Sequence, residues 1–525
     1  MERCPTQAVL PLVGLAAEKV IRDRYTRSRS MIETQSTMPP SNRLRGYVLG
    51  CAIVAALGGL LFGFDTAVIS GAEGTLREIY DLDYASIGDF FGRPEEVLTP
   101  EQEKAGLAGV AEQDLPYIQR KAFWHGFLVA AALLGTIIGA IAFGKPADRH
   151  GRRTILFVLG ALYFVSAIGS ALAWSMPAFM SFRFIGGLAV GGASVVSPMY
   201  VAEISPARFR GRLVALVQFN IVLGILLAYL SNFLISQLGL DKLTLEWRWM
   251  FGVEAIPAFA FALLLSITPR SPRWLVAQNR MDEAKRVLGR VGTDLGTVEE
   301  EVDAIQGSLE SEQQSLQDPF FCRKYMKPIM LAVTIAAFNQ LSGINALIYY
   351  TKRIFEMAGY GELAALGSSV GIGFVNLVFT MAALAIIDHF GRRKLMLVGS
   401  IGYILSLGTT AWAFYTDVGG IIVLLSLIVF IASHAFGQGA VIWVFIGEIF
   451  PNRVRARGQA LGSFTHWMMA ALISLTFPVI AEVSGAHVFA FYCVCMVGQL
   501  LWVIFVMPET KGVPLEQIQK KLGIK

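Results

Sequence analysis

Three ionisable residues interrupt long apolar runs, and their side chains could carry a proton. Asp65 lies within GLLFGFDTAVISG, Arg183 within SFRFIGG and Glu254 within FGVEAIPA. A charge at membrane depth is costly, so such groups usually pair with one another or take part in ion and proton movement. We expect Asp65 to take up a proton, Arg183 to approach it, and Glu254 to position or relay the proton. The alternative is a static Asp65–Arg183 pair that holds two helices together.

A second set of charged residues lies in short basic stretches between apolar runs. DRHGRR (148–153), which follows Gly144, recurs as DHFGRR (388–393), and EISPARFR (203–210) recurs as EIFPNRVR (448–455). Glycine allows tight turns, while acids and arginines can join neighbouring helix ends. We expect a network that latches two halves of the molecule on one face; the alternative is a plain positively charged loop. Its members are Asp148, Arg149, Arg152, Arg153, Glu203, Arg210, Asp388, Arg392, Arg393, Glu448 and Arg455.

Patterns for other chemistries are weak in this chain. Gly367-x-Ser369-x-Gly371 has the spacing of a nucleophile elbow, but nothing upstream resembles the strand that such a turn requires. The sequence has no Walker motif, and its five cysteines show neither metal-ligand spacing nor a paired framework. We therefore expect no enzyme activity, no cofactor and no metal. Glycine-rich GGLAVGG (186–192) is interpreted as a helix-packing face.

Composition indicates that lipid is the solvent for most of the chain. Hydrophobic residues make up 54% of the 525 positions and charged residues only 16%, with a mean hydropathy of +0.56. A spanning helix needs about 20 mostly apolar residues. Windows of that kind lie near 45–71, 124–144, 154–175, 178–201, 212–236, 250–268, 326–350, 367–388, 394–416, 420–447, 457–483 and 486–507. The sequence thus predicts an all-α polytopic membrane protein with twelve spanning helices.

The positions of charged residues predict how the chain is divided and oriented. Basic loops share one side if the helices alternate, which makes both termini cytoplasmic. Ala284, Val287 and Leu288 have the spacing of an amphipathic surface helix in the charged segment between the sixth and seventh windows. The expected units are a disordered cytoplasmic extension (1–44, with Met31 and Met38 as alternative starts), a six-helix bundle (45–270) with an acidic extracellular loop (72–121), a cytoplasmic helical linker (271–325), a second six-helix bundle (326–507) and a cytoplasmic tail (508–525).

The two bundles are related by an internal repeat. Besides the recurring basic motifs, Pro269 corresponds to Pro508, and GFD (63–65) corresponds to GIN (343–345). The halves are therefore parallel repeats, an arrangement in which substrate binds between them near the bilayer midplane. Asp65 corresponds to Asn345, so the first half has an acid where the second has an amide.

With these motifs in order, the chain resembles the sugar porter family of the major facilitator superfamily. The resemblance runs from about residue 45 to 516 and rests on GFDTAVISG (63–71), RFIGG (183–187), SPMYVAEISP (197–206), WRWMF (247–251), SPRWL (271–275), NQLSGINALIYY (339–350), EIFPNRVRARG (448–458) and PETKG (508–512). It implies the major facilitator fold. It also implies proton coupling, because proton-coupled members have an acid at Asp65 and at Glu254, whereas facilitative glucose carriers have Asn at the former.

The resemblance also implies a sugar site. Its residues would be Gln218, Asn339, Gln340, Asn345, Tyr349, Asn376, Trp443 and Trp467. Amides donate and accept hydrogen bonds as sugar hydroxyls do, and indole faces can stack on a pyranose. The alternatives are hydrogen bonds between helices for the amides and core packing for the tryptophans. A glycine before NALIYY would let the seventh helix break there.

Three positions depart from the family pattern. Asn339 replaces a second Gln, and His466 stands where Asn or Gln commonly precedes the Trp; both bear on which sugar is bound. Arg270 replaces an acid of the first-half motif, whereas the second half keeps Glu509, which completes the expected network there.

The expected function is secondary active transport: a sugar:proton symporter that moves a hexose, pentose or polyol into the cell by alternating access. The alternatives are a facilitative uniporter and a non-transporting sugar sensor, the latter disfavoured by the short segment after Met507. The expected partners are the sugar, the proton and the lipid bilayer, with no nucleic acid and no obligate protein partner. The expected location is the plasma membrane or a bacterial inner membrane, as a multi-pass protein.

Overall fold

The structure is a computed structural model of the chain. It describes residues 46–91, 115–292, 297–315, 319–451, 453–513 and 515–524, so the predicted extension 1–44 and part of the acidic loop lie outside the described residues. Within the described ranges, 12 helical stretches are long and apolar enough to cross a membrane, and every regular element is helical. This confirms the predicted all-α fold with twelve spanning helices.

The first six spans form one bundle. Their elements are α2 (Gly46–Phe91), α4 (Leu115–Ala142), α6 (Arg152–Ala171), α7 (Met176–Ile204), α8 (Ala207–Ser236) and the sixth span, which combines a π-helical turn η2 (Lys242–Glu246), α9 (Trp247–Gly252) and α10 (Ala255–Leu265). A short helix, α5 (Gly144–His150), joins the second and third spans.

The last six spans form the other bundle. Their elements are η3 (Arg323–Tyr325), α14 (Met326–Leu341) and α15 (Ile344–Tyr349) of the seventh span, then α17 (Glu362–Phe390), α18 (Arg392–Tyr415), α19 (Ile421–His434) with η4 (Ala435–Gly439) and α20 (Ala440–Ile449), α21 (Arg455–Val483) and α22 (Gly485–Phe505). The short helix α16 (Thr351–Met357) follows the seventh span, and α23 (Leu515–Lys521) follows the last.

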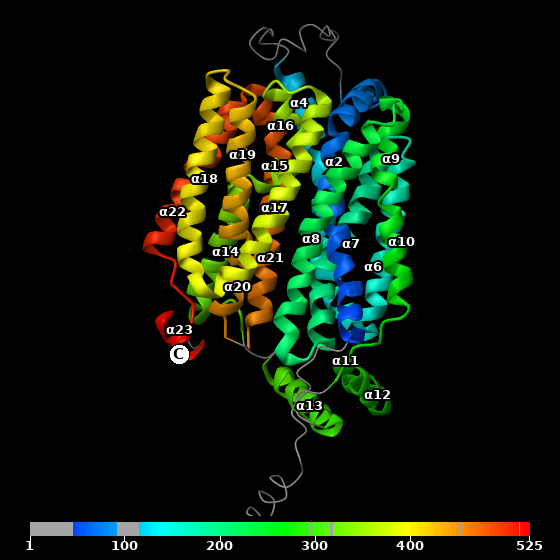
Figure 1. Cartoon of the computed structure of the whole chain (residues 1–525), viewed down its shortest axis with the longest axis vertical. Coiled ribbons are helices and arrows are strands. Elements are labelled where there is room, and N and C mark those ends of the chain that lie inside the picture. Colours follow the sequence, from blue (N-terminus) through cyan, green and yellow to red (C-terminus); the bar gives the residue numbers. More distant parts are fainter. Residues whose placement is uncertain are drawn as a thin grey trace, which may run out of the picture.

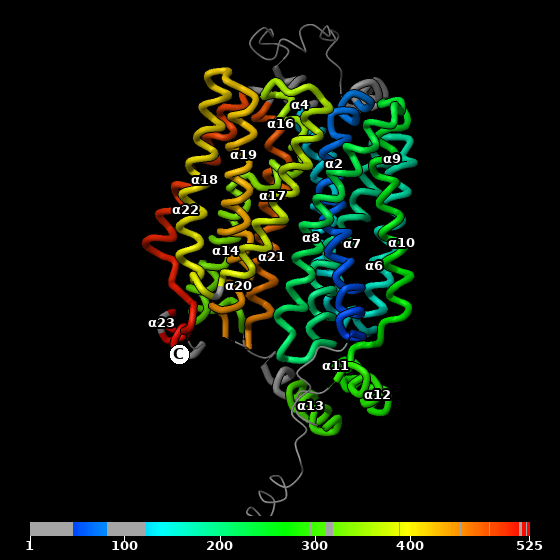
Figure 2. Tube along the Cα trace, viewed as in Figure 1, coloured from blue at the N-terminus to red at the C-terminus, as the bar shows by residue number. Residues whose placement is uncertain are grey.

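The two bundles stand side by side with their helices along the long axis, as Figure 1 shows in blue to green for the first half and green-yellow to red for the second. The linker helices α11 (Pro272–Ala277), α12 (Met281–Val291) and α13 (Val298–Ser315) lie at one end, together with α23. We call this the motif end, and the opposite end, where α16 lies, the loop end. Figure 2 traces the chain from one bundle through the linker to the other. The halves meet where α4 packs on α21 and α8 packs on α17.

Glycines let helices within a half approach closely. A Cβ atom on Gly187 of α7 would lie 1.8 Å from the carbonyl oxygen of Ala132 on α4, and one on Gly191 would lie 2.1 Å from that of Thr136. Any larger residue would therefore force the two backbones apart. This confirms that GGLAVGG is a helix-packing face.

The seventh span breaks at a glycine, as predicted. Gly343 has φ 85° and separates α14 from α15, a left-handed conformation that favours glycine. The space also requires glycine, because a Cβ there would lie 2.6 Å from the ring of Tyr492. The break places Gln340 at the end of one helix and Asn345 at the start of the next.

One predicted boundary differs from the structure, and one predicted helix face agrees with it. The first span was expected to end at residue 71, with an acidic loop after it, but α2 continues to Phe91 and the side chain of Glu73 is buried. The prediction is wrong here because partners from distant segments neutralise this acid. In the linker, Ala284, Val287 and Leu288 are buried on one face of α12, as their spacing predicts.

Candidate functional site

The predicted amides of the seventh span gather next to the break. Asn339 and Gln340 are buried at the end of α14, and Asn345 is buried in the first turn of α15. The Nε2 atom of Gln340 donates to Oδ1 of Asn339 at 3.3 Å and lies 3.1 Å from Nε2 of His466 on α21. Two helix ends and the middle of α21 thus bring amide and imidazole groups to one place.

Aromatic rings border this polar group. The His466 ring lies 4.8 Å from that of Trp467 and 5.3 Å from that of Trp443 on α20, measured between centroids. Trp467 also contacts Phe62 of α2 in the first half, with ring centroids 5.5 Å apart. Both tryptophans therefore lie beside His466, and Trp467 reaches the boundary between the halves.

Two amide atoms at this place have unused hydrogen-bonding capacity. In the described part of the chain, Oε1 of Gln340 and Nδ2 of Asn345 are buried and have no hydrogen-bond partner. A buried polar atom without a partner is costly, and native structures usually satisfy it. One acceptor and one donor are thus available for a ligand that carries hydroxyl groups.

The other predicted sugar residues lie on neighbouring helices. Tyr349 is buried at the end of α15, and Asn376 is buried on α17, where its Oδ1 accepts a hydrogen bond from Thr380 of the same helix. Gln218 is half-buried on α8, the helix that packs against α17 across the halves. Contacts thus join Gln340, Trp443 and Trp467 through His466, and Asn339 through Gln340. The sugar-binding roles of all eight predicted residues stay predictions.

The predicted proton-carrying residues are adjacent in the first half. Arg183 on α7 forms a buried ion pair with the Asp65 carboxylate on α2, and its Nη2 atom donates to the backbone oxygen of Asp65 at 3.0 Å. Glu254 lies between α9 and α10 in the sixth span, and its charge interacts with those of Asp65 and Arg183. Its Oε1 atom is buried without a hydrogen-bond partner among the described residues. A second buried acid therefore interacts with the charges of this ion pair.

A small cavity lies between this charged group and two aromatic residues of the second half. Asp65 and Arg183 line it from the first half, and Tyr349 and Trp467 line it from the second. The ion pair of the first half and the aromatic side chains of the second half therefore face the same small space.

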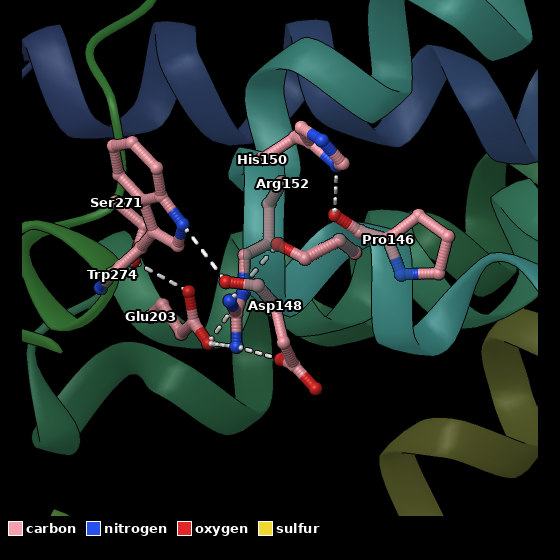
Figure 3. Close-up of polar contacts among 8 residues, drawn as sticks. Pro146, Asp148, His150, Arg152, Glu203, Ser271 and Trp274 are labelled. Atoms are coloured by element: carbon pink, nitrogen blue, oxygen red, sulfur yellow. Dashed lines mark hydrogen bonds and ion pairs between the residues drawn. The ribbon is translucent and has the colours of Figure 1, made fainter. Parts of the chain in front are cut away.

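At the motif end, the first-half charge network surrounds Arg152 (Figure 3). Its guanidinium contacts Glu203 at 2.9 Å and Asp148 at 2.8 Å. Ser271 at the start of α11 donates to the other oxygen of Glu203 at 2.5 Å, and Trp274 donates to the backbone oxygen of Asp148 at 3.0 Å. The network therefore ties α5, α6, α7 and the linker together.

The second-half network repeats this design with one addition. Arg392 contacts Glu448 at 2.8 Å, and Thr510, at the position that corresponds to Ser271, donates to Glu448 at 2.6 Å. Glu509 accepts from the backbone N–H groups of Arg392 (3.0 Å) and Arg393 (3.1 Å) at the start of α18. Arg270 stands at the equivalent first-half position and lies over the Trp274 ring instead.

These ion pairs correct the predicted latch. Each of them joins elements of a single half, so they brace helix ends within a bundle rather than tie the bundles to each other. Arg153 and Arg393 likewise donate to backbone oxygens of their own half. Arg149 and Arg210 are exposed. Arg455 begins α21 with its Nε atom buried and without a hydrogen-bond partner in the described ranges, and the side chain of Asp388 lies outside the described residues.

Sequence reasoning missed two features of the site region. His466 is a departure from the family pattern and lies outside the predicted set of sugar residues, yet it contacts Gln340 and both tryptophans. A buried pair of Glu73 and His125, 2.7 Å apart, was also missed. His125 interrupts the apolar second span, and that position is a signal of the same kind as Asp65.

Two six-helix halves with a polar site between them define a membrane transporter. Residues 51–522 match the family described as "Sugar (and other) transporter", and the chain belongs to this family. It is 34% identical over 503 residues to the D-xylose-proton symporter of Escherichia coli (strain K12), which covers 90% of this chain and 95% of that relative. The glucose transport protein of Synechocystis is also 34% identical, over 493 residues, covering 90% and 97%. A solved structure of the E. coli xylose transporter XylE, in a partially occluded inward-open conformation, aligns with a TM-score of 0.74 at 32% identity, covering 90% of this chain and 100% of that one.

Proposed function

We propose that this chain is a sugar:proton symporter that carries a monosaccharide across a cell membrane by alternating access. The observation that carries the proposal is the buried Asp65–Arg183 ion pair of the first half, which faces Tyr349 and Trp467 of the second half across a small cavity. The named activities of the relatives, xylose–proton symport and glucose transport, support a hexose or pentose as the substrate.

In the proposed site, Oε1 of Gln340 and Nδ2 of Asn345 bind sugar hydroxyls, and the indole rings pack beside the sugar ring. His466 occupies the amide nitrogen of Gln340, so that nitrogen is not available to a sugar hydroxyl. Asp65 takes up the proton, and protonation releases Arg183 from the ion pair. Glu254, whose charge interacts with those of both residues, offers a second acid for that proton.

We assign the motif end to the cytoplasm, since its loops are rich in Arg and Lys. Both termini are then cytoplasmic, and the loop end faces the outside. The polar contacts between halves described below lie at the loop end, which supports an inward-facing state. The resemblance to an inward-open transporter supports the same state.

Asp65→Asn separates symport from uniport. The purified variant in proteoliposomes should exchange labelled xylose or glucose for unlabelled sugar at a rate near that of the parent. It should not concentrate sugar when a proton gradient is imposed, and sugar addition should not alkalinise the medium. A variant that still accumulates sugar and still takes up protons with it would contradict proton coupling at Asp65. A parent protein that exchanges neither sugar would contradict sugar transport itself.

A further inference from the structure

A buried ion cluster joins the two halves at the loop end. Glu73 of α2 is only 3% exposed, and its Oε1 atom lies 2.7 Å from Nε2 of His125 on α4. The same oxygen lies 3.3 Å from Nη1 of Arg353 on α16, in the second half. One carboxylate oxygen is therefore shared between the imidazole of its own half and the guanidinium of the opposite half.

Neighbouring contacts show that the halves are closed at this end. The backbone N–H of Lys352 on α16 donates to Oγ of Ser70 on α2 at 3.3 Å. The hydroxyl of Tyr229 on α8 donates to the backbone oxygen of Ile348 on α15 at 2.8 Å. At the exposed rim, Lys242 of the first half pairs with Glu362 of the second. The Glu73 cluster is the buried part of this closure.

We propose that Glu73, His125 and Arg353 form the loop-end gate of this transporter and that His125 is a second proton-binding site, whose protonation favours opening. The proposal deepens the proposed function and rests on it in one respect, because it assumes that the halves separate at this end during transport. Breaking a buried ion pair by removing one partner is strongly unfavourable, so the Glu73–Arg353 contact has the position and the chemistry to hold the gate closed.

The direction of the proton effect follows from the charges around His125. The described charged and titratable groups of this cluster are Glu73 and Arg77 on α2, Tyr350 between α15 and α16, and Lys352, Arg353 and Glu356 on α16. With the gate closed, a protonated His125 is attracted by Glu73 but repelled by Arg353 and Lys352. With the gate open, Glu73 still attracts the protonated His125, but Arg353 and Lys352 no longer repel it. The imidazolium also neutralises the charge of Glu73 once Arg353 has moved away. Protonation therefore favours the open gate.

Labelling of a cysteine inside the gate tests this proposal in the full-length protein. Ser70 is 2% exposed and contacts the second half, so Ser70→Cys should react with a membrane-impermeant maleimide only when the gate opens. The five native cysteines are replaced by serine, and the reaction is followed in proteoliposomes without sugar. Asp65→Asn is included throughout, so that titration of Asp65 cannot contribute. Labelling needs no transport, so a failure of the proposed symport leaves this measurement intact.

Arg353→Gln should raise the labelling rate about five- to tenfold, the size of a typical coupling between two states. Arg353→Lys, which keeps the charge, should label like the parent, and Lys242→Gln at the exposed rim should change the rate little. A parent-like rate for Arg353→Gln would overturn the gate. Equal acceleration by Arg353→Lys would also overturn it, because the charge would then not matter.

The proton-binding role of His125 has its own comparison. Between pH ~8 and ~6, the range in which imidazole takes up a proton, the labelling rate of the parent, after correction for the maleimide's own pH dependence with free cysteine, should rise as the pH falls. His125→Gln should remove that rise. A rise that persists in His125→Gln, or a parent rate that falls toward low pH, would overturn the assignment of His125.

Discussion

At the scale of single residues, the proposed sugar site depends on amides that use only part of their hydrogen-bonding capacity within the protein. The Nε2 atom of Gln340 hydrogen-bonds to Asn339 and His466, while its Oε1 atom has no hydrogen-bond partner among the described residues. The Nδ2 atom of Asn345 also has no such partner. One residue therefore offers an acceptor and the other a donor. A sugar hydroxyl can serve both, because it donates and accepts.

Gln340→Ala and Asn345→Ala should each weaken sugar affinity. A hydrogen bond to a neutral hydroxyl contributes about 0.5–1.5 kcal/mol, so the dissociation constant should rise roughly three- to tenfold. Equilibrium binding of labelled xylose or glucose measures the change. Thr409→Val on α18 is a control, because Thr409 is exposed and bonds only to its own helix. If affinity is unchanged in both site variants, these amides are not sugar ligands.

The residue scale also shows how far the sequence predicts the site. Asp65, Arg183 and Glu254 could be recognised because a charge inside an apolar run is conspicuous. Glu73 was assigned to a loop because its neutralising partners, His125 and Arg353, are distant in the chain. The contact of His466 with Gln340 depends on how α14 and α21 pack, which no local pattern specifies.

At the scale of elements, the break between α14 and α15 positions the amides. Gly343→Ala should disturb that break, since its left-handed backbone costs a residue with a Cβ roughly 1–2 kcal/mol, and the added methyl would also meet the Tyr492 ring. We expect lower thermal stability in detergent together with weaker sugar binding. Gly371→Ala on α17 is the matched control, because a Cβ there has no atom within 4 Å. Equal effects of the two substitutions would show that the break is not what matters.

The helix-end networks should affect turnover more than binding. Arg152 and Arg392 lie at the motif end, away from Gln340, and each holds an acid of its own half. Arg152→Ala leaves the buried Glu203 without its cation, so it should lower both thermal stability and the transport rate, with sugar affinity nearly preserved. Arg392→Ala should do the same in the second half.

Exposed Arg149→Ala serves as the control for these network variants, and initial rates with binding isotherms separate the two quantities. A collapse of affinity with a normal residual rate would contradict the bracing role. The repeat in the sequence predicted Arg152 with Glu203 and Arg392 with Glu448 as members of these networks. It could not predict that the pairs stay within each half, since which pairs exist depends on the conformation of the whole molecule.

At the scale of the whole molecule, the described polar contacts between halves lie at the loop end, while the motif-end ion pairs stay inside each half. The twelve spans, the repeat and the linker helices were predictable, because apolar length and recurring motifs are properties of the sequence itself. The sequence could not predict whether the carrier faces inward or outward, because one sequence must form both conformations and they differ by little free energy.

The last prediction fixes the two halves together at the loop end. Lys242 of η2 and Glu362 of α17 form an exposed pair across the halves, so cysteines at both positions can be joined by a short reducible crosslinker. In a background without native cysteines, crosslinking should stop sugar exchange, because the halves can no longer separate there, and a reductant should restore it. Cysteines at Arg280 and Glu283, an ion pair within the linker, control for the reagent. If the crosslinked protein exchanges sugar at the uncrosslinked rate, the halves do not separate at the loop end, and alternating access through that end is wrong.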